Sequence, residues 1–473
     1  MMNIGRPPVF STSYDRAACD IGIVHLGYGA FHRAHQAVYV DDYMDRTGDL
    51  GWGIAAVNLR ASESDEFAFA QASDEGYLLK SSGNNMAADY RLVRPHIAFA
   101  DWSQDADAAE ALVALDTVHA ISITVTESGY YLDDSGDLNP NDTVISAELS
   151  GDAPRSVYGY LAAALARRMQ GCGLPVTIIC CDNIRGNGHM LKRNLLAYLA
   201  AVGKDMLADW VAAHAAFPCS MVDRITPRST PALQTEIDTM FPVATNRPVH
   251  SEDYIQWVLQ REFAGPMPDL GKVGVEVVAD VDPYEEAKIR ILNGGHTGLA
   301  YLAALAGHDT FDQAMHDPVL RQHFDHLVCD EILPGIQIDL PFDRMAYSSL
   351  VAERFANRAI ADALERICMD GFSKFPIFLR PTLEGCLAQG LTPSRTYASI
   401  ASWYVFARRH MQGQGRIAYH EPNGHLLKPL LADGAQLDFA RSSLLWADLP
   451  ETYGDFASQI VTAIQEMDKT WPV

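Results

Sequence analysis

The sequence has few basic residues for its length: 36 lysines and arginines stand against 60 aspartates and glutamates in 473 residues, and the formal net charge is −24. A surface this acidic repels phosphate backbones and anionic membranes, so we expect neither nucleic-acid nor membrane binding. A small anionic ligand is not excluded, because it needs only a local basic pocket. No apolar window reaches the length of a membrane span. The first fourteen residues lack the apolar core of a signal peptide, so no secretory leader is expected.

Cysteine pairs are also missing. The eight cysteines form no C-x-x-C motif, and the only adjacent two, Cys180 and Cys181, would strain a disulfide between them. Scattered thiols of this kind are typical of a reduced, cytoplasmic protein. Neither the cysteines nor the histidines around position 30 show the spacing of a zinc site, so we expect no metal.

Hydrophobic residues make up 48% of the chain and charged residues 20%, the balance of an ordinary globular protein with two or three domains. In the first part, buried apolar runs alternate with helical patterns, which predicts an α/β domain with a largely parallel, Rossmann-type sheet. The expected strands cover residues 21–26, 53–59, 120–126 and 176–181, with a last one at 273–278, and the expected helices include 37–44 and 157–169.

From Pro283 onward, helical periodicity dominates, and a proline is favourable in the first turn of a helix. The pattern predicts an all-helical second domain. Its expected helices are 285–305, 311–324, 358–369, 394–410 and 456–469. We therefore divide the chain into a dinucleotide-binding domain, residues 1–280, and a helical substrate domain, residues 281–473.

A glycine turn follows the first expected strand, in the order Gly27-Tyr28-Gly29-Ala30-Phe31-His32. Gly27 permits a tight turn, and Gly29 lets the backbone approach a pyrophosphate at the start of a helix. His32 occupies the position of the third glycine of the dinucleotide fingerprint. A lone G-x-G also fits an ordinary turn, but the apolar run before it and the helical segment after it favour a dinucleotide site.

The second expected strand ends near Arg60, Ser62 and Glu63. An acidic residue here binds the adenosine ribose of NAD, whereas Arg60 with Ser62 suits the 2′-phosphate of NADP. The choice between NAD and NADP is therefore open. Later strands end beside Glu127, in a candidate loop over the cofactor, and beside Asp182 and Asn183. Ligands of open α/β sheets lie at such ends, although Asp and Asn are also common turn residues.

The segment from Lys288 to His296 places an amine, a carboxamide and an imidazole within nine residues of an apolar helix. Burial disfavours the charged form of a lysine and lowers its pKa, which makes it a good base for an alcohol proton. Asn293 and His296 could polarise the oxygen that becomes a carbonyl. The alternative is a surface lysine followed by a loop and a core histidine. Glu285, one turn earlier, fits either a proton relay or an ion pair.

Six segments, residues 23–36, 124–130, 181–188, 222–227, 288–296 and 370–374, occur in the order and composition of one family. With them the chain resembles the long-chain polyol dehydrogenases, the group of mannitol 2-dehydrogenase and fructuronate reductase (mannonate oxidoreductase). The resemblance implies a Rossmann-type domain, a helical C-terminal domain, an active site between them, and metal-independent, NAD(P)-dependent oxidation of a secondary alcohol.

The resemblance also implies roles for single residues. Lys288 is the general acid/base, Asn183 and Asn293 bind the reacting oxygen, and His296 binds the substrate. Arg366 and Lys374 are substrate contacts from the helical domain; from the sequence pattern alone they would be surface charges. From the residues and the resemblance together, the candidate cofactor-binding positions are Gly27, Gly29, Ala30, Phe31, His32, Arg60, Glu127 and Asp223; an internal salt bridge from Asp223 to Arg224 is the alternative for that aspartate.

The expected activity is the interconversion of a sugar alcohol and its ketose, as in D-mannitol and D-fructose. The alternative is D-mannonate and D-fructuronate, whose carboxylate would need a cation such as Arg366 or Lys374. A phosphorylated polyol is not expected, because no second phosphate cradle is present. A nucleotide-binding protein without catalysis is the hypothesis of another class, and the lysine and both asparagines argue against it. The resemblance implies a monomer.

Overall fold

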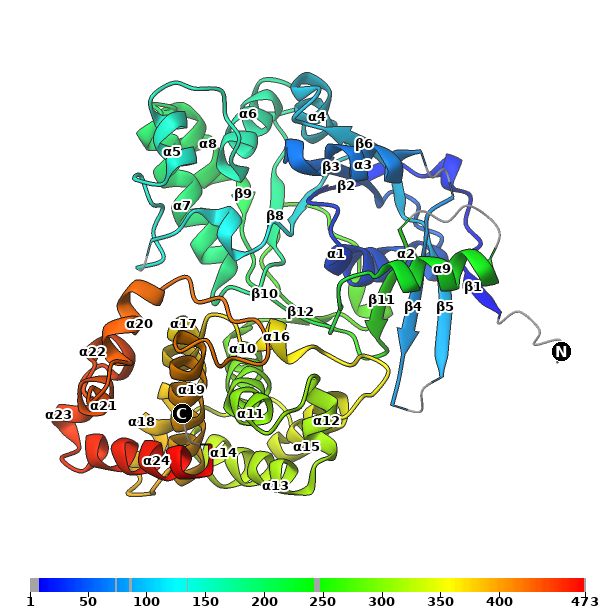
Figure 1. Cartoon of the computed structure of the whole chain (residues 1–473). Coiled ribbons are helices and arrows are strands. Elements are labelled where there is room, and N and C mark those ends of the chain that lie inside the picture. The colour runs from blue at the N-terminus through cyan, green and yellow to red at the C-terminus, as the bar shows by residue number, and fades with distance from the viewer. Residues whose placement is uncertain (1–7, 73–74, 85–86, 134, 242–246, 472–473) are drawn as a thin grey trace, which may run out of the picture. The chain divides into compact units, whose positions relative to one another are not determined.

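The computed structural model describes residues 8–72, 75–84, 87–133, 135–241 and 247–471 (Figure 1). Backbone contacts divide the chain into two units. The first comprises residues up to Asp282 apart from a short segment at 84–86, and the second begins at Pro283. The domain boundary expected after residue 280 lies two residues before this division.

The first unit contains a six-stranded parallel sheet in the order β6-β3-β2-β7-β8-β9. The chain order reverses between β2 and β7, as in dinucleotide-binding folds, and this confirms the predicted Rossmann-type α/β fold. The strands are β2 (Ile21–Leu26), β3 (Gly53–Asn58), β6 (His96–Asp101), β7 (Ala120–Ile123), β8 (Val176–Cys180) and β9 (Ala215–Ala216).

The central strands read as continuous apolar runs because both faces of the sheet are covered. On one face, Val24, Ile121 and Ile178 belong to a buried cluster with side chains of α6 (Val157–Gln170) and α7 (Asn187–Ala201). On the other face, Ile54 and Ile179 pack with side chains of α2 (Gln36–Thr47). The carboxyl ends of these parallel strands meet at one edge of the sheet.

Two smaller sheets complete this unit. One has the order β1-β5-β4-β11, with β1 (Val9–Ser11), β5 (Ala88–Val93), β4 (Tyr77–Ser82) and β11 (Val249–Glu252). The other has the order β10-β12-β13, with β10 (Ser220–Asp223), β12 (Gln256–Gln260) and β13 (Glu276–Val278). The last strand was expected at 273–278; it starts later, because Leu270–Val273 form a 3-10 helix, and it lies outside the parallel sheet.

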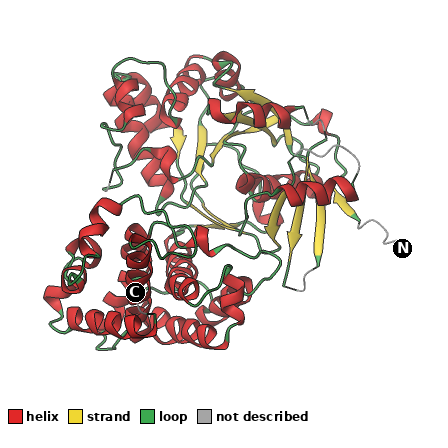
Figure 2. Ribbon diagram, in the orientation of Figure 1, coloured by secondary structure: helices red, strands yellow, loops and turns green. Residues whose placement is uncertain are grey.

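The described residues of the second unit form helices and no β-strand (Figure 2). Its central element is a continuous helical stretch made of α10 (Asp282–Ala287), the π-helix η5 (Lys288–Asn293) and α11 (Gly294–Leu305). Helix α11 is buried on nearly every side and contacts α19 (Ser394–Met411), which in turn packs on α24 (Phe456–Thr470). The helices predicted at 285–305, 394–410 and 456–469 are confirmed.

Besides the start of the last strand, three further predictions of element bounds were wrong. The helix expected at 311–324 is broken into α12 (Phe311–His316) and α13 (Pro318–His326), because Pro318 cannot continue the hydrogen bonds of α12. The helix expected at 358–369 is reduced to α16 (Leu364–Ile367), since Ala361 takes a positive φ of 46° and ends any regular helix there. Strand β7 ends at Ile123, three residues before the expected end.

Candidate active site

The glycine turn after β2 is fixed by its own geometry. Gly27 has a φ of +96°, and a Cβ at this position would lie 2.2 Å from the carbonyl oxygen of Thr124. Only glycine fits there. Gly29 precedes helix α1 (Ala30–Ala34), and a Cβ on it would meet no atom within 4 Å. The fold itself therefore does not require glycine at 29, and the open space beside it suits the close approach of a ligand.

A buried histidine supports this turn from the sheet side. The hydroxyl of Thr124 donates to the carbonyl oxygen of Gly27 (3.3 Å), so it accepts a hydrogen bond from Nε2 of His25 (2.9 Å). Nδ1 of His25 then accepts from the hydroxyl of Ser122 (2.7 Å). Burial lowers the pKa of His25 to about 3. A neutral imidazole in one tautomer thus links β7 to the turn.

His32 lies in the interior, in the position of the absent third glycine. Its ring stacks on His25 with a centroid distance of 3.3 Å, and its Nε2 lies 2.9 Å from Nε2 of His96. Burial holds the pKa values of His32 and His96 well below the usual range. The imidazole packs beneath the turn, and its expected contact with a cofactor stays a prediction. Phe31, on the same helix, stacks on His35 with a centroid distance of 5.0 Å.

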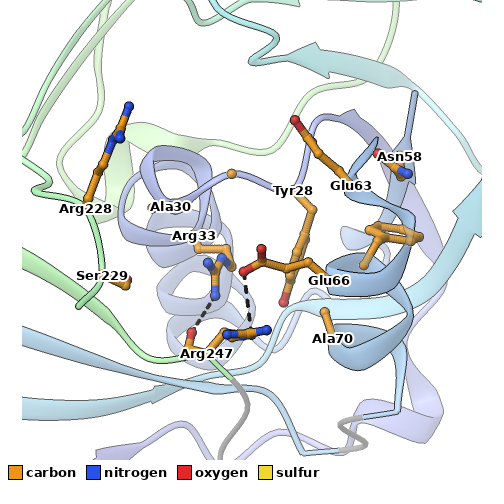
Figure 3. Close-up of a pocket in the computed structure, with 12 residues that line it drawn as sticks. Tyr28, Ala30, Arg33, Asn58, Glu63, Glu66, Ala70, Arg228, Ser229 and Arg247 are labelled. Atoms are coloured by element: carbon orange, nitrogen blue, oxygen red, sulfur yellow. Dashed lines mark hydrogen bonds and ion pairs between the residues drawn. The ribbon is translucent and has the colours of Figure 1, made fainter. Parts of the chain in front are cut away.

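A pocket of about 630 Å³ opens beside Gly29 and Ala30 (Figure 3). Its lining also includes Tyr28 and Arg33, which sequence reasoning missed, and Glu63, which it named. Arg33 is buried, its guanidinium lies over the ring of Tyr28 at 5.2 Å, and it donates to the carbonyl oxygen of Arg247 (2.6 Å). A glycine turn, a helix start and a neighbouring cation together suit a phosphate-containing ligand.

At the end of β3, Arg60 is already engaged by its neighbours. Its guanidinium lies 3.5 Å from the carboxylate of Glu63 and donates to the carbonyl oxygen of Val125 (3.1 Å). The side chain of Asn58 holds this corner by donating to the carbonyl oxygen of Arg60 (2.9 Å). Both ends of the ion pair are about half exposed, so its energetic contribution is small.

Asp182, just after β8, clamps the segment that leaves β7. Its carboxylate accepts from the backbone N–H groups of Val125 (2.9 Å) and Thr126 (3.0 Å) and from the hydroxyl of Tyr130 (2.7 Å). Burial raises the pKa of Asp182 to about 6. The clamp holds Thr126 at a positive φ of 69° and leads into the short helix η3 (Glu127–Tyr130), which exposes Glu127.

The other two predicted residues of this unit lie at the ends of strands β8 and β10. Asn183 comes directly after Asp182 and is exposed, whereas Asp223 is the buried last residue of β10. The side chain of Asn187 joins the two strands, because its amide donates to the carbonyl oxygen of Asp182 (3.1 Å) and its oxygen accepts from the N–H of Ser220 (2.9 Å).

In the helical unit, Lys288 and Asn293 are the first and last residues of η5. A π turn bonds residue i to residue i+5, so residues five apart lie one turn above each other on the same side of the helix. In a regular α-helix they would point well apart. Lys288 is 8% exposed, and Glu285, one turn earlier, is 5% exposed. The π turn therefore presents the amine and the carboxamide on one face.

His296, on the next turn, sits between two aromatic rings. Phe355 stacks on it with a centroid distance of 4.8 Å, and Phe311 meets it edge-on at 4.4 Å. Burial lowers the pKa of His296 to about 3, so the ring is neutral and can donate or accept one hydrogen bond at each nitrogen. Its Nε2 lies 3.9 Å from a carboxylate oxygen of Asp362.

Asp362, which was not predicted from the sequence, also forms an ion pair with Arg366. Nε of Arg366 donates to one oxygen of Asp362 (2.9 Å), and an Nη donates to the other. Lys374 donates to the carbonyl oxygen of Ile367 (2.9 Å), and burial lowers its pKa. The structure thus gathers His296 and Arg366 around one carboxylate. The i, i+4 spacing of Asp362 and Arg366 was the signal that could have revealed the pair.

Other features bear on cofactors and location. Among the residues that the structure describes, no group of three or more histidine, cysteine, aspartate or glutamate side chains is arranged to hold a metal ion. Along the same ranges, every helix is too short or too polar to span a bilayer. All eight cysteines are free, and five of them are buried.

Two family models match the chain one after the other. The Mannitol dehydrogenase Rossmann domain matches residues 21–272, and the Mannitol dehydrogenase C-terminal domain matches residues 280–468. D-arabinitol 4-dehydrogenase of Ralstonia nicotianae is 37% identical over 84% of this chain and 86% of its own. D-mannonate oxidoreductase of Escherichia coli is 32% identical over 97% and 96%. The solved structure of Pseudomonas fluorescens mannitol 2-dehydrogenase, a ternary complex with NAD and D-mannitol, is 31% identical, with a TM-score of 0.85 over 98% of this chain and 94% of that one.

Proposed function

Because the chain belongs to the mannitol dehydrogenase family, we propose that it oxidises a neutral sugar alcohol to its ketose with NAD, as in D-mannitol to D-fructose. Family membership makes it a polyol dehydrogenase, an oxidoreductase whose first domain is a dinucleotide-binding Rossmann domain. The proposal concerns the substrate, the cofactor and the roles of single residues. In it, residues 1–280 bind the cofactor and residues 281–473 supply the base.

Lys288 is the proposed general base. Oxidation of an alcohol removes a proton from oxygen and a hydride from carbon, and the nicotinamide, when bound, accepts the hydride. Lys288 accepts the proton, and the carboxamides of Asn183 and Asn293 hold the oxygen as it becomes a carbonyl. The low exposure of Lys288 and its place on one face with Asn293 support this role. His296, held neutral, orients a substrate hydroxyl, and Glu285 relays the proton outward.

The observation that carries the choice of a neutral substrate is the pairing of Arg366 with Asp362. A carboxylate substrate needs an available cation, and the guanidinium of Arg366 is already bound at two points by a carboxylate. A hydroxyl needs no net charge. It can accept from Lys374 and exchange hydrogen bonds with His296.

The reaction of D-mannonate is the second candidate. It is supported by the similarity to D-mannonate oxidoreductase of Escherichia coli. The ammonium of Lys374 has three N–H donors, of which one is directed at the carbonyl oxygen of Ile367. The remaining two could bind a carboxylate if Arg366 moved away from Asp362.

For the cofactor, we propose NAD over NADP. The pocket lined by Gly29 and Ala30 supports a dinucleotide site, in which we assign the phosphate turn to Gly27, Gly29, Ala30 and Phe31, with His32 buried behind it. Glu63 lines this pocket and suits a ribose hydroxyl, whereas Arg60 is not among the residues that line it and donates to the carbonyl oxygen of Val125. Glu127 and Asp223 are the proposed contacts toward the nicotinamide end. Replacing Glu63 with alanine is expected to lower the preference for NAD over NADP by roughly tenfold.

We also propose that the enzyme is a metal-independent monomer that works in a reducing, cytoplasmic compartment, a location supported by its eight free cysteines. The test of the whole proposal is the absorbance of reduced cofactor at 340 nm with NAD or NADP, near pH 9, with and without EDTA. D-mannitol, D-arabinitol, D-sorbitol and D-mannonate form the substrate panel. Turnover of a neutral polyol that resists EDTA supports the proposal. Turnover of D-mannonate alone selects the second candidate, and loss with EDTA contradicts the metal-independent reaction.

A further inference from the structure

We propose that Asp362 sets the substrate charge of this enzyme: it keeps Arg366 from binding a carboxylate and thereby selects neutral polyols over aldonates. The inference rests on the proposed function, because it concerns the substrate of the same site. Asp362 is a specificity-determining residue here, not a catalytic one.

The geometry places Asp362 at the centre of the substrate residues of the helical unit. Its two oxygens accept separate hydrogen bonds from the guanidinium of Arg366, the strongest arrangement for this pair of groups. The carboxyl side chain is 10% exposed, whereas the side chain of Arg366 is 55% exposed. The carboxylate of Asp362 is thus largely buried, whereas about half of the Arg366 side chain is open to solvent.

The backbone around Asp362 is held in a fixed position. The carbonyl oxygen of Asp362 accepts from the N–H of Phe311 (2.9 Å), and the N–H of Leu364 donates to the carbonyl oxygen of Asp309 (2.9 Å). Ala361, just before it, has a φ of +46°, a conformation that costs energy for a residue with a Cβ. A strained backbone conformation of this kind persists where the surrounding contacts hold it in place. Here those contacts fix the position of the Asp362 carboxylate.

The charges around the site do not favour an anion. Arg366 and Lys374 supply two positive charges, and both act on the buried ring of His296 together with Asp362. Asp370 and Glu421 add negative charge beside Lys374. Glu421 is fixed there, because it accepts from the N–H of Phe372 (3.0 Å) and from the hydroxyl of Tyr419 (2.8 Å). The carboxylates of Asp362, Asp370 and Glu421 outnumber the cations of Arg366 and Lys374. These five groups therefore carry no net positive charge that would attract an aldonate.

A carboxylate on the substrate would therefore compete with Asp362 for Arg366 and would lie close to a like charge. A CH₂OH group in the same place carries no charge, so it is not repelled by Asp362 and does not have to displace it from Arg366. Removal of the charge of Asp362 would free the guanidinium of Arg366 to bind a carboxylate, and would therefore favour an aldonate over a neutral polyol. It would leave Lys288 and Asn293 unchanged.

The test compares Asp362→Asn with the matched control Glu365→Gln, which removes the same charge from an exposed position next to Arg366. Binding of D-mannonate to the full-length enzyme saturated with NADH is measured by calorimetry, alongside kcat/KM for D-mannitol and D-mannonate. Asp362→Asn is expected to tighten D-mannonate binding by about ten- to a hundredfold, the range of one charge-assisted hydrogen bond. Glu365→Gln is expected to leave it unchanged.

Unchanged D-mannonate binding in a folded Asp362→Asn enzyme would overturn the inference, and so would an equal gain in Glu365→Gln, which would indicate a general charge effect. If Asp362→Asn does not fold, Asp362→Ser provides the same comparison. Failure of the proposed function is seen separately, as absence of neutral-polyol oxidation by the unaltered enzyme. A wild-type enzyme that oxidises polyols, with variants that gain no aldonate affinity, would leave the function standing and reject the role of Asp362.

Discussion

The two units of this protein hold their site residues in different ways. In the Rossmann unit, the site is a set of strand ends, and buried side chains fix the backbone there: His25 through Thr124, and Asp182 through three donors. In the helical unit, the site is a set of side chains placed by the register of one helix and by a distant segment that carries Asp362. The first arrangement depends on hydrogen bonds from buried side chains to the backbone or to Thr124, and the second depends on helix register and on an ion pair between side chains.

Replacement of Lys288, the proposed base, should have the largest effect of the variants described here. Lys288→Ala is expected to lower kcat for polyol oxidation by roughly a thousandfold, since general base catalysis contributes about 10²–10⁴. The affinity for NAD, measured by fluorescence titration, should not change, because the cofactor belongs to the other unit. Lys428→Ala, at an exposed lysine of the helical unit, is the control and should leave kcat unaltered. Unchanged kcat in Lys288→Ala would reject the catalytic assignment.

The two asparagines test whether both units contribute to the reacting oxygen. Asn293→Ala and Asn183→Ala are each expected to lower kcat by about a hundredfold, the usual effect of removing one donor to a developing oxyanion. Steady-state kinetics, with cofactor titrations beside them, would separate turnover from binding. An equal loss of kcat and cofactor affinity in either variant would indicate a distorted fold instead of a lost donor.

Two glycine variants would distinguish, within the Rossmann unit, a glycine that the fold requires from one that only a ligand would require. Gly27→Ala should lower the free energy of unfolding by about 1–3 kcal/mol or more, because of its positive φ and the close carbonyl of Thr124. Gly29→Ala should change it by less than about 0.5 kcal/mol, since the added Cβ has room. Urea unfolding measures both. If Gly29 faces the cofactor, its variant should still weaken NAD binding; normal NAD affinity would contradict that placement.

Acid should destabilise both units through buried histidines, among them His25 in the Rossmann unit and His296 in the helical unit. Burial lowers the pKa values of His25 and His296 to about 3. Between about pH 6.5, the pKa of an unfolded-state histidine, and about pH 3, a proton binds these side chains only in the unfolded state. The stability that each neutral histidine contributes is therefore fully present above about pH 6.5 and is lost as the pH falls toward 3. At pH 5.5 each histidine should cost about 1.4 kcal/mol relative to pH 7.5.

Urea unfolding at these two pH values tests this effect, with His296→Gln compared with His420→Gln. His420 is exposed and provides the control substitution. His296→Gln should reduce it. An identical pH dependence in His296→Gln and the unaltered protein would show that His296 does not titrate as described.

The sequence allowed the parallel sheet to be predicted because strands covered on both faces read as apolar runs, and β2, β3, β7 and β8 all do so. The sheet that contains β4 and β5 was missed, since Tyr77–Ser82 and Ala88–Val93 mix polar and apolar residues in short strands. The last strand and the broken helices were misjudged for a related reason. Their ends are set by contacts with distant segments, which periodicity does not report.

The candidate site shows the same limit. Residues that lie within one short stretch, such as Gly27 and Gly29 or Lys288 and Asn293, could be named as candidates from the sequence, and their roles stay predictions. The supporting residues were not. His25 reaches the turn through Thr124, almost a hundred positions away, and Asp362 was hidden inside a helix that was predicted but does not form. Most of these supporting contacts join distant segments, so they depend on the tertiary fold; the i, i+4 spacing of Asp362 and Arg366 was a local signal for one of them.

The π turn of η5 contains one residue more than an α turn, so it is equivalent to a single insertion in an otherwise regular helix. Deleting that residue would rotate one half of the helix against the other by about 100° and separate Lys288 from Asn293. The placement of Lys288 and Asn293 five residues apart on one face therefore depends on this π turn. In a relative, a spacing shorter by one residue would indicate that the lysine acts with a different partner, or that the helix no longer serves this chemistry.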